Sequence, residues 1–341
     1  MRPVTIIGGG IGGLALGNLL AAKGVPTTIR EAGDYPRHRV CGEFLAGSES
    51  LAWQALGLPD LLQGASRHQR VRWYGEKNCL ADYPLPSPVP GLSRWALDQR
   101  LAEAFVARGG RLQVKDRVGR RETLPTEGVL WSTGKASGQS DWLGLKFHVR
   151  EKTGEPVLEM HLGRQAYVGI SHVEDGWLNV CGLFRRLPGV KAPKKELARA
   201  YFRAVGLNQL ADRWDDSAID EESCCAVSGF SFGLAGSGGD EHVSLGDAFG
   251  MIPPFTGNGM TMALQSALLV EPHLIAYALG EADWEETMKK VRLALAKAFG
   301  RRLRWGVRLQ KLLDGPRTGG LLRHMAEKRL LPFRTLYRLT H

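Results

Sequence analysis

The first residues whose spacing indicates a ligand-binding site are glycines close to the N-terminus. Gly8, Gly10 and Gly13 have the G-x-G-x-x-G spacing and follow the β-branched run Val4 to Ile7. In such a turn the first glycine permits a sharp bend, the second lets backbone approach a pyrophosphate, and the third lets the next helix pack closely on the strand. Free N–H groups at that helix N-terminus also attract a diphosphate. The spacing therefore predicts a dinucleotide site.

An acidic residue extends this site. Glu31 ends the expected second strand, where a carboxylate accepts hydrogen bonds from an adenosine ribose. A carboxylate there disfavours a 2′-phosphate, so FAD or NAD fits better than NADP. A second glycine-rich segment, Gly246 to Met260, lies far along the chain. Together the two segments indicate one long cofactor, held at an adenine-nucleotide end and at a flavin end.

The elements expected to position these groups alternate between strands and helices. Apolar alternation predicts strands over residues 4–7, 27–31, 68–74, 111–115, 128–132, 165–170, 177–184, 223–232 and 242–245. Helical patterns cover residues 44–64, with a loop around Gly57-Leu58-Pro59, and residues 92–108 and 194–205. Ser93 is the expected cap of the helix over residues 92–108. Four prolines make residues 83–91 an extended connection.

This order predicts an α/β protein made of interleaved domains. A Rossmann-like FAD-binding domain of the glutathione-reductase type takes residues 1–75, 92–140 and 236–285. A substrate domain built on an antiparallel β-sheet takes residues 76–91 and 141–235. Residues 286–341 form a basic C-terminal helical tail.

Length and composition are those of a globular enzyme. At 341 residues the chain can bury a large core, and its apolar and charged fractions, 43% and 23%, are ordinary. The chain opens directly into a core strand, so we expect no cleavable signal peptide. Residues 260–279 are apolar but interrupted by polar side chains, and we expect them to be too polar to span a bilayer.

Cysteine usage bears on the compartment. The five cysteines are an odd number without zinc spacing, which favours a reducing cytoplasm. The neighbours Cys224 and Cys225 could form a vicinal disulfide, but two adjacent strand residues are expected to point to opposite faces.

The net charge of +10 is concentrated in the tail. From Lys289 onward, fifteen Lys and Arg stand against Asp314 and Glu327. Apolar residues recur at every fourth position from Val291 to Val307, with arginines on the flanks of this stripe. The favoured interpretation is a helix that packs on the body and solvates its charges. A peripheral contact with an anionic membrane, or a lid over a greasy substrate, is the alternative. We expect no nucleic-acid partner, because no binding module accompanies the charge.

Four stretches resemble one large flavoprotein superfamily, which includes aromatic-ring hydroxylases, geranylgeranyl reductases and flavin-dependent halogenases. They are the N-terminal glycine motif, residues 39–43 (Arg-Val-Cys-Gly-Glu), residues 93–101 and the segment Gly246 to Met260. They spread over most of the chain that precedes the basic tail. The resemblance implies non-covalent FAD and an oxidoreductase activity in which the flavin transfers electrons.

The expected cofactor-binding residues come from these stretches and from the end of the second strand: Gly8, Gly10, Gly13, Glu31, Arg39, Cys41, Gly42, Arg94, Asp247, Gly257, Asn258, Gly259 and Met260. The resemblance implies that Asp247 bonds the ribityl chain and that the prolines after it lie beside the isoalloxazine. It also implies that the helix led by Gly257 to Met260 directs its N–H groups at the pyrimidine carbonyl and N1, where reduced flavin is anionic. For Arg94, a salt bridge with Asp98 at i+4 is the alternative.

The Cys41-Gly42 pair is closer to the geranylgeranyl reductases, where a Cys-Gly loop runs beside the flavin ring. For Cys41, a redox role and a small apolar contact are both open, and the contact is favoured. Two features of the hydroxylases are missing. Thr133-Gly134 stands where they carry Asp-Gly, and Gly250 stands where they favour His. The electron donor is thus left open between NAD(P)H and a partner reductase. The halogenase motif and its catalytic lysine are not found.

The expected sheet carries polar residues able to hold a substrate, although each is more often an ordinary sheet residue: His161, Tyr167, His172, Asn179 and Cys181.

We predict an FAD-dependent oxidoreductase, and we favour a monooxygenase or oxidase acting on an apolar aromatic or polyketide-like molecule. Oxygen would react with the flavin beside Pro253 and Pro254, and Cys41 is the further catalytic candidate. Reduction of isoprenoid double bonds is the close alternative. A flavin-free NAD dehydrogenase would not need the segment Gly246 to Met260, and a non-catalytic nucleotide-binding protein is the remaining hypothesis.

Overall fold

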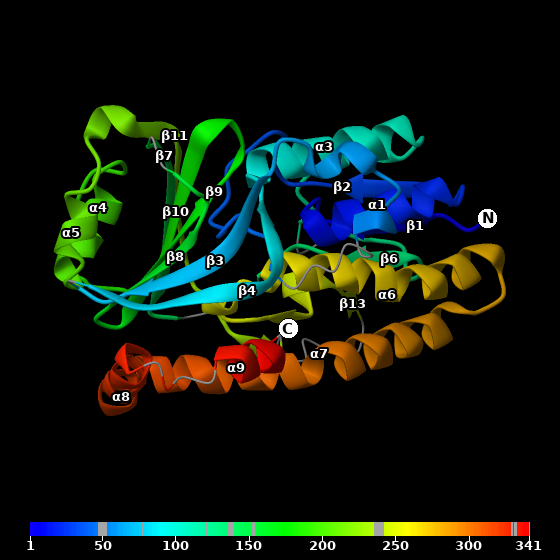
Figure 1. Ribbon diagram of the computed structural model, residues 1–341. Coiled ribbons are helices and arrows are strands. Elements are labelled where there is room, and N and C mark those ends of the chain that lie inside the picture. The colour runs from blue at the N-terminus through cyan, green and yellow to red at the C-terminus, as the bar shows by residue number, and fades with distance from the viewer. Residues whose placement is uncertain are drawn as a thin grey trace.

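Two large β-sheets, the helices that link them and a long C-terminal helical arm make up most of the protein (Figure 1). The computed structural model describes residues 1–46, 53–76, 78–119, 122–135, 140–151, 154–234, 242–328, 330 and 333–340. Within these residues the strands form a five-stranded sheet, a seven-stranded sheet and a small two-stranded sheet. The mixed α/β class, with parallel and antiparallel sheets and a helical C-terminus, agrees with the sequence-based prediction.

The five-stranded sheet is parallel and brings distant segments together. Its order is β13-β6-β1-β2-β5, with bounds Val243–Ser244, Val129–Trp131, Val4–Ile7, Thr27–Arg30 and Arg111–Gln113. Since the carboxyl ends of parallel strands share one edge, the segments after β1 and β13 meet there. The helices α1 (Ile11–Ala22), α3 (Arg94–Ala107) and α6 (Gly259–Leu279) pack around this sheet. The Ser93 hydroxyl caps α3 by accepting from the Ala96 N–H, as predicted.

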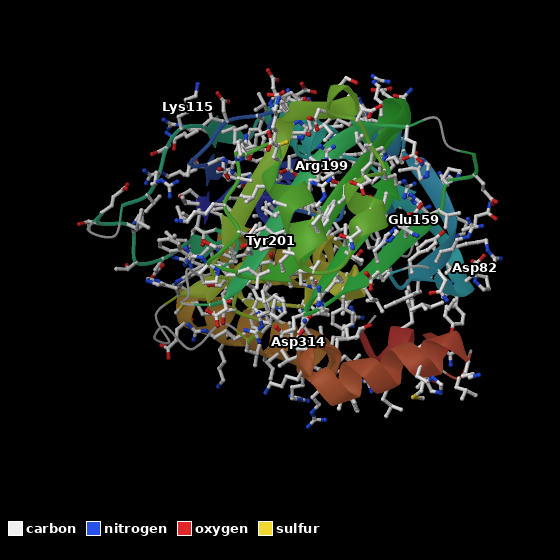
Figure 2. All side chains as sticks on the ribbon, turned by 90° about the vertical axis from the view of Figure 1, so that its left-hand side faces the viewer. Asp82, Lys115, Glu159, Arg199, Tyr201 and Asp314 are labelled. Carbon is white, nitrogen blue, oxygen red and sulfur yellow. The ribbon has the colours of Figure 1, made fainter. Side chains whose placement is uncertain are left out.

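The seven-stranded sheet is largely antiparallel and has two different faces. Its order is β11-β7-β10-β9-β8-β3-β4, with bounds Ile219–Ser228, Trp142–Arg150, Trp177–Arg185, Ala166–His172, Leu158–Gly163, Ser66–Tyr74 and Cys79–Gly91. On β7, Leu145, Phe147 and Val149 pack on one face with residues of α4 (Leu197–Ala204) and α5 (Asn208–Ala211). Figure 2 looks onto this outer face, with Arg199 and Tyr201 of α4 in front of the sheet. Alternation puts Lys146 and His148 on the inner face.

Three sequence-based predictions require correction. The proline-rich residues 83–91 are not a connection but the end of β4, and β4 is an edge strand, where proline is tolerated. β3 pairs with β4 and β8, so it belongs to the large sheet although the sequence assigned residues 1–75 to the cofactor domain. The helix expected over residues 44–64 falls partly outside the described residues, and Phe44 forms a bridge with Gly91 while Pro59–Leu62 is a 3-10 turn.

The C-terminal arm packs on the body. It consists of α7 (Trp284–Asp314), α8 (Pro316–Glu327) and α9 (Phe333–Thr340). The predicted apolar stripe of α7 is buried from Val291 to Leu303. A Cβ on Gly306 would lie 2.9 Å from Pro253 Cδ, so glycine allows α7 to approach the second glycine-rich segment closely. α9 reaches the same segment, because Asn258 Nδ2 donates to the Thr340 carbonyl at 2.6 Å.

One helix has the dimensions of a membrane span. Within the described residues, α6 alone is long and apolar enough to cross a bilayer by length and composition, so the expectation that these residues are too polar is not met on those two measures. Of its most apolar window, 44% is buried, and α6 packs against α1 and α7. Buried core helices pass the same test.

Candidate active site

A cavity of about 700 Å³ runs along the carboxyl edge of the parallel sheet and under the inner face of the large sheet. Most of the predicted cofactor and catalytic residues line it: Gly8, Gly10, Glu31, Arg39, Cys41, Gly42, Arg94, Asp247, Pro254, Gly257, Gly259 and Met260. Gly13, Pro253 and Asn258 do not line it. Gly13 lies against Gly8, Pro253 lies against Gly306 of α7, and Asn258 binds Thr340 of α9.

The glycine turn leaves free space where a pyrophosphate would bind. A Cβ on Gly8 would press on the Ser132 carbonyl, and one on Gly13 would press on the Gly8 carbonyl, so the protein's own packing requires both glycines. Around Gly10, by contrast, a Cβ would meet no atom of the described residues within 4 Å. Gly10 therefore leaves backbone open toward the cavity, as a dinucleotide requires.

Glu31 is an ionised carboxylate at the end of β2. It accepts hydrogen bonds from the N–H groups of Gly9 at 2.7 Å and Gly33 at 2.8 Å, and it pairs with Arg37 at 2.6 Å. Burial opposes its ionisation, but the hydrogen bond from Gly33 and the charges of Arg37 and Arg39 hold the pKa of Glu31 below its ordinary value. Since a carboxylate offers about four acceptor positions, it can still accept from ribose hydroxyls.

Asp98 holds two arginines on the cavity wall. Its buried carboxylate binds Arg94 Nε and Nη2 at 2.8 and 2.7 Å, and Arg39 Nε at 3.1 Å. The sequence treated the Asp98 pair as an alternative to a cofactor contact by Arg94. The pair with Asp98 is present, and Arg94 also lines the cavity, so the pair leaves a cofactor contact by Arg94 open as a prediction. The link from Asp98 to Arg39 was not predicted, since it joins residues 59 positions apart.

The fold and this site have counterparts among known proteins. No family model matches the sequence. A menaquinone reductase of Mycolicibacterium smegmatis is 21% identical over 309 residues, which cover 78% of this chain and 74% of that protein.

Among solved structures, HpxO of Klebsiella pneumoniae, complexed with FAD and uric acid, has a TM-score of 0.75 at 13% identity, covering 99% of this chain and 96% of that one. A geranylgeranyl bacteriochlorophyll reductase-like protein of Thermoplasma acidophilum has a TM-score of 0.75 at 17% identity, covering 99% and 95%. PqsL, a probable FAD-dependent monooxygenase from Pseudomonas aeruginosa, has a TM-score of 0.71 at 15% identity, covering 93% and 98%.

The chain has the fold of the FAD-dependent oxidoreductases. A probable monooxygenase and a reductase-like protein both appear among these structures, so the fold agrees with the predicted superfamily. The predictions of an FAD-dependent oxidoreductase and of FAD as cofactor agree with the same comparisons.

The flavoprotein fold places a short loop between the cavity and the large sheet. The Cys41 carbonyl accepts from Asn179 Nδ2 at 3.0 Å, and the Gly42 carbonyl accepts from Ser171 Oγ at 2.7 Å. Cys41 is partly exposed, and burial raises the pKa of its thiol although Arg94 lies nearby. The Cys41 sulfur is therefore a neutral thiol around neutral pH, which fits a small contact better than a thiolate nucleophile.

The predicted sheet residues divide into two groups. Asn179 holds the Cys41 loop, Cys181 lies beside Lys146 of β7, and Tyr167 packs edge-on against Phe255 with ring centroids 6.2 Å apart. The two histidines lie elsewhere.

His161 binds Glu159 at 2.8 Å beside a separate cavity of about 320 Å³, and His172 packs near His68. Neither histidine lines the cofactor cavity. Tyr167, Asn179 and Cys181 do not line it either.

The sequence missed the charged residues behind the Cys41 loop. Glu43 is buried and contacts Lys146 and His148, which are buried as well. A usable signal existed, because Lys146 and His148 are polar residues two apart on a strand and must share a face. Nothing local showed that this face meets residue 43.

Cys224 and Cys225 point to opposite faces, as predicted. Cys224 packs with the residues under α4, whereas Cys225 lines the cofactor cavity, and both are free thiols.

Proposed function

We propose that this flavoprotein binds FAD non-covalently along the cavity and is a monooxygenase of apolar aromatic or polyketide-like molecules. The observation that carries the proposal is the continuity of the cavity. It extends from the open backbone at Gly10, past Asp247 and Pro254, to an apolar wall that includes Phe230 and Met251. HpxO and PqsL, of similar fold, are solved with uric acid and 2-aminobenzoylacetate. A cofactor end and an apolar substrate end in one space suit oxidation of a small organic molecule.

The FAD-binding part is proposed to be of the glutathione-reductase type. It would comprise the five-stranded sheet and its helices, and the large sheet would cover the substrate end. The division into residues 1–75, 92–140 and 236–285 against residues 76–91 and 141–235 holds in this proposal with one change, the transfer of β3 (Ser66–Tyr74) to the substrate part.

The chain's own residues have separable tasks in this proposal. Glu31 accepts from the adenosine ribose, and Asp247 accepts from the ribityl hydroxyls. Gly257 adopts a left-handed φ of +71°, which turns the chain into α6, and the first N–H groups of α6 at Gly259 and Met260 favour negative charge on the flavin pyrimidine. The bound flavin supplies the electron transfer.

Reduction of an isoprenoid double bond is the second candidate. The Cys41-Gly42 loop lies on the cavity wall, and the sequence relative is a menaquinone reductase while one structural neighbour is reductase-like. A neutral thiol at Cys41 is also compatible with an apolar cavity wall next to an alkene substrate.

The two reactions differ in their need for oxygen. Protein reduced with dithionite is mixed with candidate aromatic and isoprenoid substrates under argon and then in air. Product that gains one oxygen atom only in air supports the monooxygenase, whereas substrate-dependent flavin reoxidation under argon supports the reductase. Protein that shows no flavin absorbance after FAD addition and gel filtration would refute both and leave the NAD dehydrogenase or the nucleotide-binding protein. Comparing NADH, NADPH and dithionite as reductants shows whether a partner reductase is needed.

Affinity for FAD is expected to rise with pH through the ionisation of Asp247. Burial raises the pKa of Asp247 to about 6, although the Arg94 charge partly opposes this. Only the ionised carboxylate accepts from ribityl hydroxyls without a competing proton, so bound FAD favours the form present above pH 6. The dissociation constant should fall by about tenfold between pH 5 and pH 7.

Fluorescence titration with FAD at both pH values measures this effect. Asp247→Asn serves as the control and should bind FAD weakly at both values. An unchanged pH dependence in Asp247→Asn would remove Asp247 from the ribityl site.

Location is proposed to be the cytoplasm, with peripheral contact to an anionic bilayer through the basic arm. Exposed leucines accompany the arm's positive charges, with Leu312 42% and Leu321 60% exposed. Flotation with vesicles of phosphatidylglycerol and of phosphatidylcholine tests it. Binding to the anionic vesicles alone supports the contact, and binding to neither refutes it.

A further inference from the structure

A buried ionic cluster lies at the cavity wall, where Glu43 is one of the lining residues and Lys146 and His148 are not. The side chains of Glu43 and Lys146 are both 0% exposed, and Lys146 Nζ lies 3.4 Å from Glu43 Oε1. His148 Nε2 lies 2.6 Å from the other carboxylate oxygen. The Arg94 N–H donates to Glu43 Oε1 at 3.0 Å. One carboxylate therefore joins the Cys41 loop, strand β7 and the start of α3.

The same residue has a strained backbone. Glu43 has a φ of +55°, in the left-handed region that costs a non-glycine residue about 1–2 kcal/mol. Such a conformation persists where surrounding contacts over-determine it. Here the two preceding carbonyls are held by Ser171 and Asn179, and the Glu43 carbonyl accepts from the Leu92 N–H at 3.0 Å. The side-chain contacts of Glu43 complete this set.

The contact between Glu43 and β7 is ionic. Burial opposes ionisation of Glu43, but the Lys146 charge and the hydrogen bond from His148 outweigh it and hold the pKa of Glu43 below its ordinary value. A carboxylate that stays ionised inside the protein keeps its cationic and N–H partners in place, because leaving it unpaired is strongly unfavourable.

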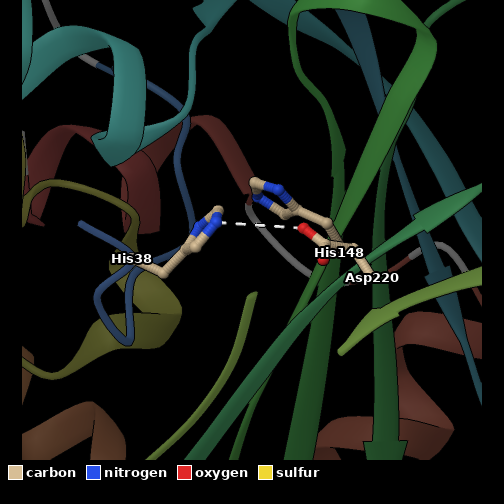
Figure 3. Close-up of side chains that lie close together, drawn as sticks. All are labelled: His38, His148 and Asp220. Carbon is tan, nitrogen blue, oxygen red and sulfur yellow. Dashed lines mark ion pairs between the residues drawn. The ribbon is translucent and has the colours of Figure 1, made fainter. Parts of the chain in front are cut away.

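A neighbouring set of side chains, which shares His148 with the ionic cluster, suggests a metal site. His38, His148 and Asp220 offer ligand atoms within 4.8 Å of one another. Figure 3 shows these three side chains lying close together. However, Lys146 Nζ lies 3.0 Å from His38 Nδ1 and donates a hydrogen bond to it. Because Nδ1 of His38 accepts this hydrogen bond, the neutral imidazole ring carries its proton on Nε2. That nitrogen faces Asp220 at 3.9 Å and has no lone pair for a metal. The cluster is therefore a hydrogen-bonded and ionic one.

We propose that Glu43 is a positioning residue for Cys41. By binding Lys146 and His148 it locks the turn that sets the Cys41 thiol on the cavity wall, and it ties that wall to the sheet that covers the substrate end. The inference rests on the proposed function only in taking FAD as the occupant of the cavity. The position of Cys41 itself can be measured without FAD.

Glu43→Gln is the test, because glutamine preserves size and an acceptor for the Arg94 N–H but removes the charge. Glu159→Gln is the matched control. Glu159 lies on the same sheet and is also paired with a histidine and a cation, His161 and Arg213, but it borders the separate cavity. Alkylation of Cys41 by iodoacetamide is followed in the FAD-free protein by mass spectrometry of its peptide, and FAD affinity is titrated separately.

We expect the Cys41 alkylation rate to rise about tenfold in Glu43→Gln and FAD binding to weaken about tenfold, the change that one charged hydrogen bond supports. Both quantities should stay at wild-type values in Glu159→Gln. A purely structural role would lower the melting temperature of both variants and leave Cys41 reactivity alike in the two.

An unchanged Cys41 rate in folded Glu43→Gln would overturn the positioning role. If that variant does not fold, Ser171→Ala replaces it, because this change removes only the hydroxyl that donates to the Gly42 carbonyl. The Cys41 alkylation rate must then rise in Ser171→Ala, and an unchanged rate overturns the positioning role. A third outcome separates the two proposals. If the wild-type protein binds no FAD but Glu43→Gln still raises the alkylation rate of Cys41, the proposed function is refuted and the positioning role is supported.

Discussion

Gly10→Ala is expected to give a folded protein that has lost most of its affinity for FAD. Gly10 has φ of −81° and ψ of −177°, a conformation that alanine adopts readily, and a Cβ there meets no described atom within 4 Å. The protein alone therefore has no reason to keep glycine at this position. A pyrophosphate laid against the turn would fill that space, and overpacking it costs about 1–3 kcal/mol, or roughly tenfold to hundredfold in affinity.

Gly13→Ala provides the contrast. Its Cβ would press on the Gly8 carbonyl, a backbone atom that cannot swing away, so α1 must separate from β1. Thermal melting should show a large loss of stability in Gly13→Ala and a loss of at most about 1 kcal/mol in Gly10→Ala. FAD binding is titrated by fluorescence. Wild-type affinity in Gly10→Ala would place the pyrophosphate somewhere other than this turn.

Local signals in the sequence predicted the cofactor end of the site well. The glycine spacing, the β-branched run before it and the helix after it are all short-range patterns, and β1, α1 and β2 lie where they were expected. Glu31 follows from the same count along the chain. Its contact with the Gly9 N–H is local to this unit as well, because β1 and β2 are neighbours.

Long-range pairing explains what the sequence did not reveal. β3 joins the large sheet because it pairs in parallel with β8, a strand from a distant part of the chain, and no local pattern encodes that partner. Glu43 meets His148 across 105 residues. The apolar stripe of α7 was recognised, yet its contact with Pro253 depends on Gly306, whose role appears only when the two segments are packed.

The Cys41 loop therefore depends on both its local sequence and its long-range contacts. Its sequence resembles a flavin-contacting loop, but its shape is imposed by polar side chains of the large sheet that the resemblance does not include. Ser171, Asn179, Lys146 and His148 are all on that sheet. A substrate bound under the sheet would consequently contact the same strands that hold the loop in place.

Lys146→Met is expected to cause the largest loss of stability among the point variants considered. It removes the buried ammonium next to Glu43 while the carboxylate stays enclosed. Removing one partner of a buried ion pair costs about 3–5 kcal/mol, and the lower end applies because His148 still contacts Glu43. The melting temperature should fall by at least about 6 °C.

Adding Glu43→Gln to Lys146→Met should restore most of that loss, because the uncompensated carboxylate charge then disappears. Lys195→Met is the control, since Lys195 pairs with Glu221 at 3.0 Å with both side chains well exposed, and its loss should cost less than about 1 kcal/mol. Thermal melting of the two single variants and of the double variant completes the cycle. A double variant no more stable than Lys146→Met would mean that lysine contributes by packing its stem and not by neutralising Glu43, and the ionic account of the loop would fail with it.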